Sequence, residues 1–312
     1  MRSPPRIAAF AVWALVGAAS TLATAVVPSR ASAQLQTDAA APPTTPHDET
    51  TRYEWSPRWR RFSTADYLLT AGAAGVALAS QLLSPLTPHR SGGMLFDESV
   101  RDALRPDSRT ERQLWRDMSD IFLSLAVAYP YLVDALIDAA WAHDSPDVAR
   151  QMALIDTETF AITAALQGIA TFVSGRERPY VRTCGGETPA DSADCTSTDR
   201  FRSFFSGHTS LTFTAATLTC SHHAHFALYG GALDPAACVT GLALAAATGM
   251  FRVMADMHYL TDALTGAAIG TFSGLFFPWL LHYRNGSGEA SPSTAHVMLV
   301  PVGLGAGLAG DF

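Results

Sequence analysis

Two histidines in the C-terminal half of the chain stand in settings that suit phosphate chemistry. The first, His208, follows Ser206 and Gly207 directly ahead of an apolar run at 211–220. A helix that begins there presents unpaired backbone N–H groups and a partial positive charge, which attract anions, and glycine lets a ligand approach the backbone closely. Histidine moves protons near neutral pH. The stretch predicts an anion site with a proton donor beside it, although a helix-capping serine next to a surface histidine would look the same.

The second histidine, His258, has a carboxylate partner. Asp262 follows it by four residues, so on a helix both side chains share one face, where the carboxylate can fix the imidazole tautomer. A ring held in this way is a better nucleophile or base. Arg252 precedes the pair, and Arg176 and Arg178 lie upstream; their planar charged forks match phosphate oxygens. A structural pair and solvated helix ends would explain each feature alone, but together the features predict phosphoryl transfer through a histidine.

These stretches resemble the signature of the type 2 phosphatidic acid phosphatase and vanadium haloperoxidase superfamily, which reads K-x6-R-P, P-S-G-H and S-R-x5-H-x3-D. In the same order and spacing, the chain has Thr171-x6-Arg178-Pro179, Phe205-Ser206-Gly207-His208 and Phe251-Arg252-x5-His258-x3-Asp262. The resemblance covers about residues 64–283, and a three-part match is a specific signal. It implies an all-α fold, a six-helix bundle, that hydrolyses phosphomonoesters or diphosphates, mostly of lipids, without a metal cofactor.

The resemblance also implies a role for each matching residue. His258 is implied as the nucleophile that takes the phosphoryl group, with Asp262 orienting it. His208 is implied as the general acid that protonates the leaving oxygen. The residues implied to hold the phosphate and its transition-state charge are Arg178, Arg252, Ser206 and Gly207.

Position 171 departs most seriously from the family pattern. Thr171 stands where the family has a lysine, and the chain contains no lysine at all, because all 21 basic residues are arginine. We expect Arg176 to supply the missing cation at the phosphate and Thr171 to offer it a hydroxyl. Losing a charged contact costs about 1.5–3 kcal/mol, so weakened rather than abolished activity is expected. Phe205 and Phe251 replace a proline and a serine of the signature and change less.

The leading hypothesis is therefore a metal-independent phosphatase that acts on a phosphorylated small molecule or lipid through a phosphohistidine. Two alternatives stay open. Vanadate mimics phosphate, so the same cradle suits a vanadate-dependent haloperoxidase, with vanadate as cofactor rather than inhibitor. The missing lysine suits a non-catalytic domain that binds phosphate or lipid headgroups. No metal is expected, and the histidines at 222, 223 and 225 are predicted to lie in a solvated loop. The net charge of −7 argues against a nucleic-acid partner.

Six long segments rich in alanine and leucine predict the helices that must position these residues. They run at about 64–83, 117–142, 147–173, 207–222, 235–254 and 258–283. The polar loop 175–206 carries part of the first motif, and loops of this length inside a compact domain are usually functional. If successive helices alternate in direction, all three motifs fall at one end of the bundle.

Four regions divide the chain. Residues 1–33 predict a secretory signal, in which basic residues precede an apolar run and an A-x-A cleavage pattern, although an uncleaved anchor helix would use the same run. Residues 34–57, rich in Ala, Pro and Thr, predict a flexible linker. The helical phosphatase domain takes residues 58–284, and the Gly-rich C-terminal tail, 285–312, predicts a small hairpin.

Export to an oxidising compartment suits the four cysteines. Cys184 and Cys195 flank one short connection, and Cys220 and Cys238 flank another, so two local disulfides are the simplest of three connectivities. If all six helices crossed a membrane, the two pairs would face opposite sides, one of them reducing. Carboxylates within the helices are also costly in lipid. We therefore expect a periplasmic domain or one held at the membrane surface; an integral membrane protein is the alternative.

Overall fold

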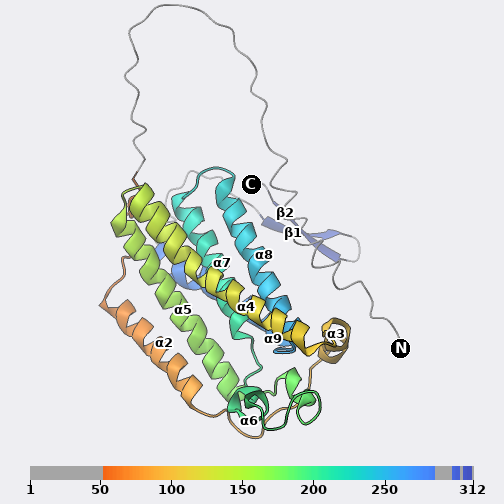
Figure 1. The fold of residues 1–312 in the computed structure, drawn as a ribbon. Helices are drawn as coiled ribbons and strands as arrows, with labels where there is room; N and C mark the ends of the chain where they lie inside the picture. The colour runs from red at the N-terminus through yellow and green to blue at the C-terminus, as the bar shows by residue number, and fades with distance from the viewer. Residues whose placement is uncertain (1–51, 285–296, 303–304, 311–312) are drawn as a thin grey trace, which may run out of the picture.

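The computed structural model describes residues 52–284, 297–302 and 305–310 (Figure 1). Eight α-helices occur in these residues: α2 (Thr64–Leu82), α3 (Asp97–Leu104), α4 (Arg109–Tyr129), α5 (Pro146–Ser174), α6 (Ala193–Thr196), α7 (Gly207–Phe226), α8 (Leu233–Met254) and α9 (Leu260–Pro278). Two π-helical segments, η1 (Pro130–Ala142) and η4 (Trp279–Tyr283), continue α4 and α9. Two 3-10 helices, η2 (Pro179–Thr183) and η3 (Thr198–Phe201), lie in the loop before α7.

The predicted all-α class is confirmed, whereas the predicted count of six helices is not. Each predicted segment coincides with a long helical element, and the additional helices α3 and α6 are short, with 8 and 4 residues. Both lie toward one end of the bundle (Figure 1). Helix α4 begins at Arg109, ahead of the predicted start at 117. The prediction followed apolar residues, whereas the first turns of α4 are polar and amphipathic.

Close packing of α7 against α9 brings the second and third motifs together. Three glycines recur every four residues along α9 and face α7: Gly266, Gly270 and Gly274. A Cβ atom at Gly270 would lie only 2.2 Å from the Ser210 carbonyl oxygen, so a larger residue would push the helices apart. The N-termini of the two helices consequently meet, and the Ser206 N–H donates to the Asp262 carbonyl oxygen at 3.1 Å.

Polar side chains fill much of the interior, while large apolar side chains cover much of the outside. Helix α7 buries seven hydroxyl-bearing residues: Thr209, Ser210, Thr212, Thr214, Thr217, Thr219 and Ser221. Most of their hydroxyls donate to carbonyl oxygens one turn earlier in the helix. Exposed apolar side chains on the long helices include Leu68, Leu78, Leu125, Leu136, Trp141, Leu264 and Phe272. Apolar surface of this extent marks a site of contact with protein or lipid.

Three helical segments are long and apolar enough to cross a membrane, by length and composition: Arg109–Ala142, Leu233–Met254 and Leu260–Tyr283. Together with the apolar exterior, they favour a membrane-associated protein over a free periplasmic domain. The predicted export signal, 1–33, lies outside the described residues.

Residues at the start of the described chain pack onto the bundle. Trp55 is buried in an apolar cluster that includes Met152, Ile155 and Tyr283. Residues 52–57 therefore belong to the folded unit and not to the predicted linker 34–57, because their aromatic side chains find apolar partners on the helices. The remainder of that linker lies outside the described residues.

Both predicted disulfides are present. The Cα atoms of Cys184 and Cys195 lie 5.8 Å apart, and those of Cys220 and Cys238 lie 4.6 Å apart. The C-terminal strands β1 (Val297–Val302) and β2 (Gly305–Gly310) pair antiparallel with Val297 opposite Gly310, which confirms the predicted hairpin.

Candidate active site

Backbone hydrogen bonds join the three motifs at one end of the bundle. Helix α5 ends at Gly175, whose φ of 51° turns the chain sharply into the first motif. The Tyr180 N–H donates to the Asp256 carbonyl oxygen at 3.0 Å, which ties the first motif to the third. The bond from Ser206 to Asp262 ties the second to the third. The predicted meeting of the motifs at one end is therefore confirmed.

His258 is held with one ring nitrogen free. Its Nδ1 lies 2.7 Å from the Ser203 carbonyl oxygen, which can only accept, so Nδ1 carries the proton and Nε2 keeps its lone pair. Asp262 accepts a hydrogen bond from Ser203 Oγ at 2.6 Å, whereas its distance to the ring is 3.8 Å. The predicted pairing on one helix face is wrong, because His258 precedes α9, which begins at Leu260. Asp262 therefore acts on the ring largely through Ser203. Burial and the nearby guanidinium groups of Arg178 and Arg252 lower the pKa of His258 well below its usual value, which keeps the imidazole neutral.

His208 lies in the first turn of α7, with Nε2 2.7 Å from Asp120 Oδ1. Ser206 caps the same helix, because its Oγ accepts the Thr209 N–H. Burial and the charge of Arg252 lower the pKa of His208 to about 3, while Asp120 opposes them. A bound phosphate would add negative charge beside the ring and raise that pKa. An anion bound beside His208 would therefore favour its protonated form.

Two arginines bring like charges close together at the same place. Arg178 donates from Nη1 to the Met257 carbonyl oxygen at 3.4 Å, and burial lowers its pKa. Arg252 Nη1 lies 3.2 Å from both Ser119 Oγ and Asp120 Oδ1, and its buried Nε has no partner among the described residues. Of the two, Arg252 is buried and Arg178 is partly buried. Like charges held close together in this way are costly unless an anion neutralises them, so the geometry favours an anion beside His258.

The structure corrects the predicted roles of Arg176 and Thr171. The Arg176 guanidinium is buried and donates to Asp262 Oδ1 at 2.5 Å and to Asp97 Oδ2 at 2.7 Å. It therefore serves two carboxylates instead of a phosphate. Thr171 is fully buried, and its Oγ1 donates to the carbonyl oxygens of Gln167 and Gly168 in its own helix. Neither side chain replaces the lysine of the family signature in the way that the sequence predicted.

Sequence reasoning missed four residues that support the site: Asp97, Asp120, Ser203 and Asp256. Asp256 accepts two hydrogen bonds from Arg101, at 2.6 and 2.7 Å, which fixes the loop before His258. Asp97 accepts the Thr261 N–H at 2.9 Å at the start of α9. Ser203 begins the stretch SFFSGHTS, so its position next to the second motif was a usable signal. The three aspartates carried no motif signal.

Three clustered histidines differ from their prediction. His222, His223 and His225 lie in α7 rather than in a solvated loop, and the first two are buried. His222 Nε2 contacts Asp156 Oδ1 at 2.8 Å, and His223 Nδ1 contacts Asp234 Oδ1 at 2.6 Å. His222 and His223 can therefore be buried because each has its own carboxylate partner, and not because they share a metal ion.

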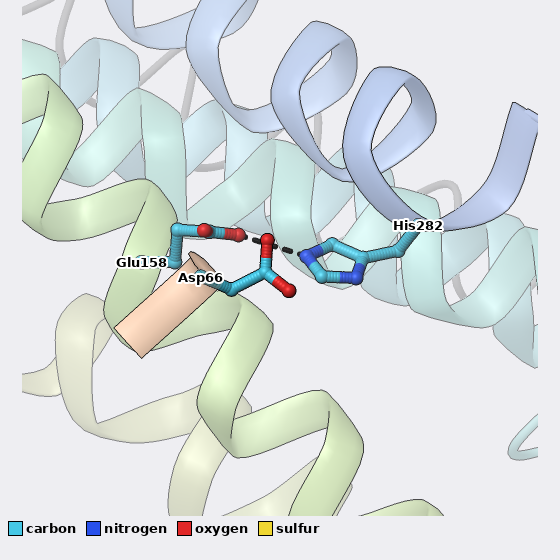
Figure 2. A group of neighbouring side chains, drawn as sticks. All are labelled: Asp66, Glu158 and His282. Carbon is cyan, nitrogen blue, oxygen red and sulfur yellow. Dashed lines mark hydrogen bonds and ion pairs between the residues drawn. The ribbon is translucent and has the colours of Figure 1, made fainter. Parts of the chain in front are cut away.

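A second polar cluster, formed by Asp66, Glu158 and His282, lies at the far end of α9–η4 from His258 (Figure 2). Their ligand-type atoms lie within 4.8 Å of one another, as a metal ion would require. His282 Nε2 contacts Glu158 Oε2 at 2.8 Å, and Asp66 accepts hydrogen bonds from Arg60 and Ser63. These partners already explain the cluster as a polar link between α2, α5 and η4.

The bundle brings together two histidines, two arginines and the N-terminus of α7, which is the set of groups that the motif resemblance implied. The family model of the PAP2 superfamily matches residues 154–286, which contain all three motifs. The resemblance that the motifs predicted is therefore confirmed over this part of the chain. A lipid A 1-phosphatase of Porphyromonas gingivalis is 35% identical over 88 residues, which make up 28% of this chain and 18% of that protein. The chain thus spans less than a fifth of that relative's length. No solved structure matches the chain.

The contact between Asp120 and His208 predicts a change in pH dependence. A general acid must be protonated, so kcat falls as pH rises through its pKa. Because Asp120 raises the pKa of His208, Asp120→Asn should move the alkaline limb of the kcat profile about one pH unit lower. Asp117→Asn, an exposed change on the same helix, is the control. Matching profiles for Asp120→Asn and the parent would show that Asp120 does not tune the acid.

Proposed function

We propose that the protein is a phosphatase of lipid phosphates that works through a phosphohistidine on His258. One observation carries the proposal. The unprotonated Nε2 of a neutral His258 lies in the field of Arg178 and Arg252, with a second histidine at a helix N-terminus beside them. That arrangement supplies a nucleophile, charge stabilisation and an acid in one place.

The reaction follows from these positions. The lone pair on His258 Nε2 attacks phosphorus, and the bond from phosphorus to the lipid oxygen breaks while His208 gives that oxygen its proton. Arg178, Arg252 and the first N–H groups of α7 stabilise the negative charge of the transferring group. A water molecule then attacks phosphorus and gives a proton to His208, while the phosphorus–nitrogen bond breaks and its electron pair returns to His258 Nε2. Inorganic phosphate leaves, and both histidines return to their starting states.

A lipid substrate fits the apolar surroundings of the site. A cavity of about 350 Å³ between α4, α7 and α8 is lined mostly by apolar side chains, including Leu125, Ala215 and Leu244. These lie five, seven and eight residues along their helices from Asp120, His208 and Arg252, or about 8–12 Å at 1.5 Å per residue. An acyl or prenyl chain could lie there while its phosphate occupies the anion site. The name of the lipid A 1-phosphatase relative is consistent with this class of substrate.

An assay of the purified protein in detergent tests the proposal. Phosphate release should be measured from phosphatidic acid and from p-nitrophenyl phosphate, with and without orthovanadate and with EDTA. We expect release from the lipid, inhibition by vanadate and no effect of EDTA. Halide oxidation that requires vanadate would instead identify a haloperoxidase, and phosphate binding without turnover would identify a binding domain.

A further inference from the structure

Helix α4 presents a row of arginines to an open cavity beside the candidate active site. Arg109, Arg112 and Arg116 follow at spacings of three and four, which places them on one helix face. All three line the cavity, together with Tyr180 and Met257 on other segments. Met257 directly precedes His258, and Tyr180 follows Arg178 by two residues. The cavity therefore adjoins the place where the scissile phosphate would bind.

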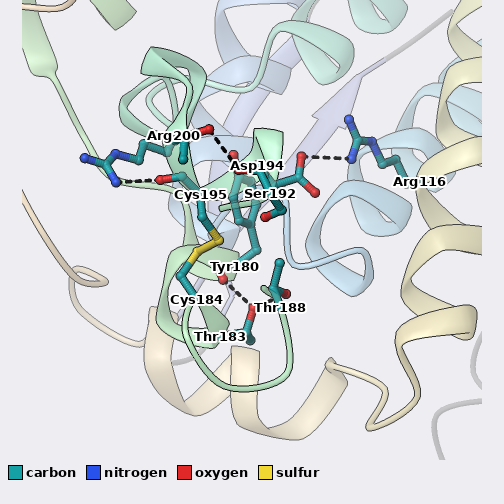
Figure 3. The surroundings of a disulfide bond; sticks show 10 residues. Arg116, Tyr180, Thr183, Cys184, Thr188, Ser192, Asp194, Cys195 and Arg200 are labelled. Atoms are coloured by element: carbon teal, nitrogen blue, oxygen red, sulfur yellow. Dashed lines mark hydrogen bonds and ion pairs between the residues drawn. A yellow bond between two sulfur atoms is a disulfide. The ribbon is translucent and has the colours of Figure 1, made fainter. Parts of the chain in front are cut away.

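Two of the three guanidinium groups have donors to spare. Arg112 is fixed by the carbonyl oxygens of Pro106 and Asp107 and by Glu187. Arg109 is exposed, and no residue of the described chain pairs with it. Arg116 meets one carboxylate, Asp194, at 3.5 Å, which is longer than a hydrogen bond (Figure 3).

Nearby carboxylates neutralise the positive charge of this arginine row only in part. Glu187 is shared between Arg112 and Arg105, so it balances the arginine that is already fixed. Asp194 also lines the cavity, and its side chain is 42% exposed, so an incoming anion can replace it beside Arg116. The lining thus holds three guanidinium groups against one carboxylate.

Tyr180 adds one further donor to the lining. Burial raises the pKa of its hydroxyl, so that hydroxyl stays protonated and can donate. The hydroxyls of Thr183 and Thr188, which also line the cavity, are already engaged: Thr183 Oγ1 donates to the Tyr180 carbonyl oxygen at 2.7 Å and lies 2.8 Å from Thr188 Oγ1. The charge of Arg116 also lowers the pKa of Arg178, which means that the row and the active site share one positive field. The active-site groups suffice to bind a single phosphate. The additional arginines of the row could therefore neutralise negative charge beyond that of one phosphate.

We propose that Arg109 and Arg116, with Tyr180, bind a second phosphate group of the substrate while the scissile phosphate lies at His258. The inference rests on the proposed function and narrows it to lipids that carry two phosphates. Guanidinium forks match phosphate oxygens bidentately, which a second phosphate would use. The second phosphate can be the inner phosphate of a diphosphate or a separate phosphate on the headgroup.

Substrate discrimination tests this subsite. The double variant Arg109→Gln/Arg116→Gln should be compared with the parent on farnesyl diphosphate and farnesyl monophosphate. We expect the ratio of kcat/KM for the diphosphate to that for the monophosphate to fall at least tenfold in the variant, mainly through KM. Arg150→Gln, an exposed change near the start of α5, should leave the ratio as it is. A ratio that the double variant does not change would overturn the proposal for diphosphates.

A binding measurement separates failure of this inference from failure of the proposed function. Calorimetry with inorganic pyrophosphate and phosphate needs no turnover. We expect the parent to bind pyrophosphate more tightly than phosphate and the double variant to lose this preference. A lipid with two separate phosphates forms the third arm: a loss confined to that lipid would place the second phosphate on the headgroup. Equal effects of the double variant on every ligand, in binding and in turnover, would sink the subsite even if the protein is a phosphatase.

Discussion

His258→Ala is expected to lower kcat for lipid phosphate hydrolysis by at least about 10³-fold, because it removes the nitrogen lone pair that is proposed to attack phosphorus. The ring nitrogen that faces the anion site is free only because Ser203 holds the other one. The measurement is kcat under saturating substrate, together with a search for a phosphoprotein after rapid denaturation in alkali, where phosphohistidine survives.

His208→Ala provides the contrast that separates nucleophile from acid. Loss of a general acid costs about 10²–10⁴-fold when the leaving group needs a proton, and much less with p-nitrophenol, which leaves readily as an anion. The phosphoprotein should still form. His225→Ala, which lies at the other end of α7, should act as the parent. Parental turnover in His258→Ala would sink the proposed nucleophile.

Short-range spacing explains why part of this site could be predicted from the sequence. Ser206 and His208 are close along the chain, and the geometry of the α7 N-terminus fixes their relative placement. His258 and Asp262 are also close along the chain, but His258 precedes α9, so their spacing predicted proximity and not a shared helix face. Asp97 and Asp120 come from α3 and α4, far away in sequence. Only tertiary packing brings them to the motifs, and a single sequence carries no record of that packing.

The first motif shows where helical spacing stops being informative. Thr171 and Arg178 would share a face if α5 continued through both, but the helix ends at Gly175 in a left-handed conformation. Beyond that residue, spacing no longer sets direction. Arg176 and Arg178 therefore reach different partners although only one residue separates them: Arg176 reaches Asp262, while Arg178 reaches the Met257 carbonyl oxygen.

The long helices show a similar limit. Their apolar composition predicted helices correctly, but it could not say which faces turn outward. Side chains such as Leu125 and Trp141 are exposed, while polar ones such as Thr214 and His222 are buried. A helix with its apolar side chains turned outward has the same composition as one with them turned inward, so only the structure distinguishes the two arrangements.

Arg176→Met should destabilise the protein by about 3–5 kcal/mol, because it leaves two buried carboxylates without their shared cation. Asp97 on α3 and Asp262 on α9 are both fully buried near the N-terminus of α9. Each carboxylate accepts a hydrogen bond from one end of the Arg176 guanidinium. For a domain of this size, such a loss lowers Tm by about 10 °C. Arg176→Lys should recover only part of the lost stability. It restores a positive charge, but a single ammonium cannot bridge both carboxylates as the planar guanidinium does.

Thermal unfolding and phosphate affinity, measured on the same samples, decide between the two roles considered for Arg176. Arg61→Met is the matched control, because it breaks an exposed pair with Asp147 that should contribute less than about 1 kcal/mol. If Arg176 supports Asp262, Arg176→Met should lose stability while the folded protein still binds vanadate. If Arg176 instead binds phosphate, vanadate affinity should fall by tenfold or more with Tm unchanged. That second result would contradict the placement of Arg176 behind Asp262 and would restore it as the substitute for the missing lysine.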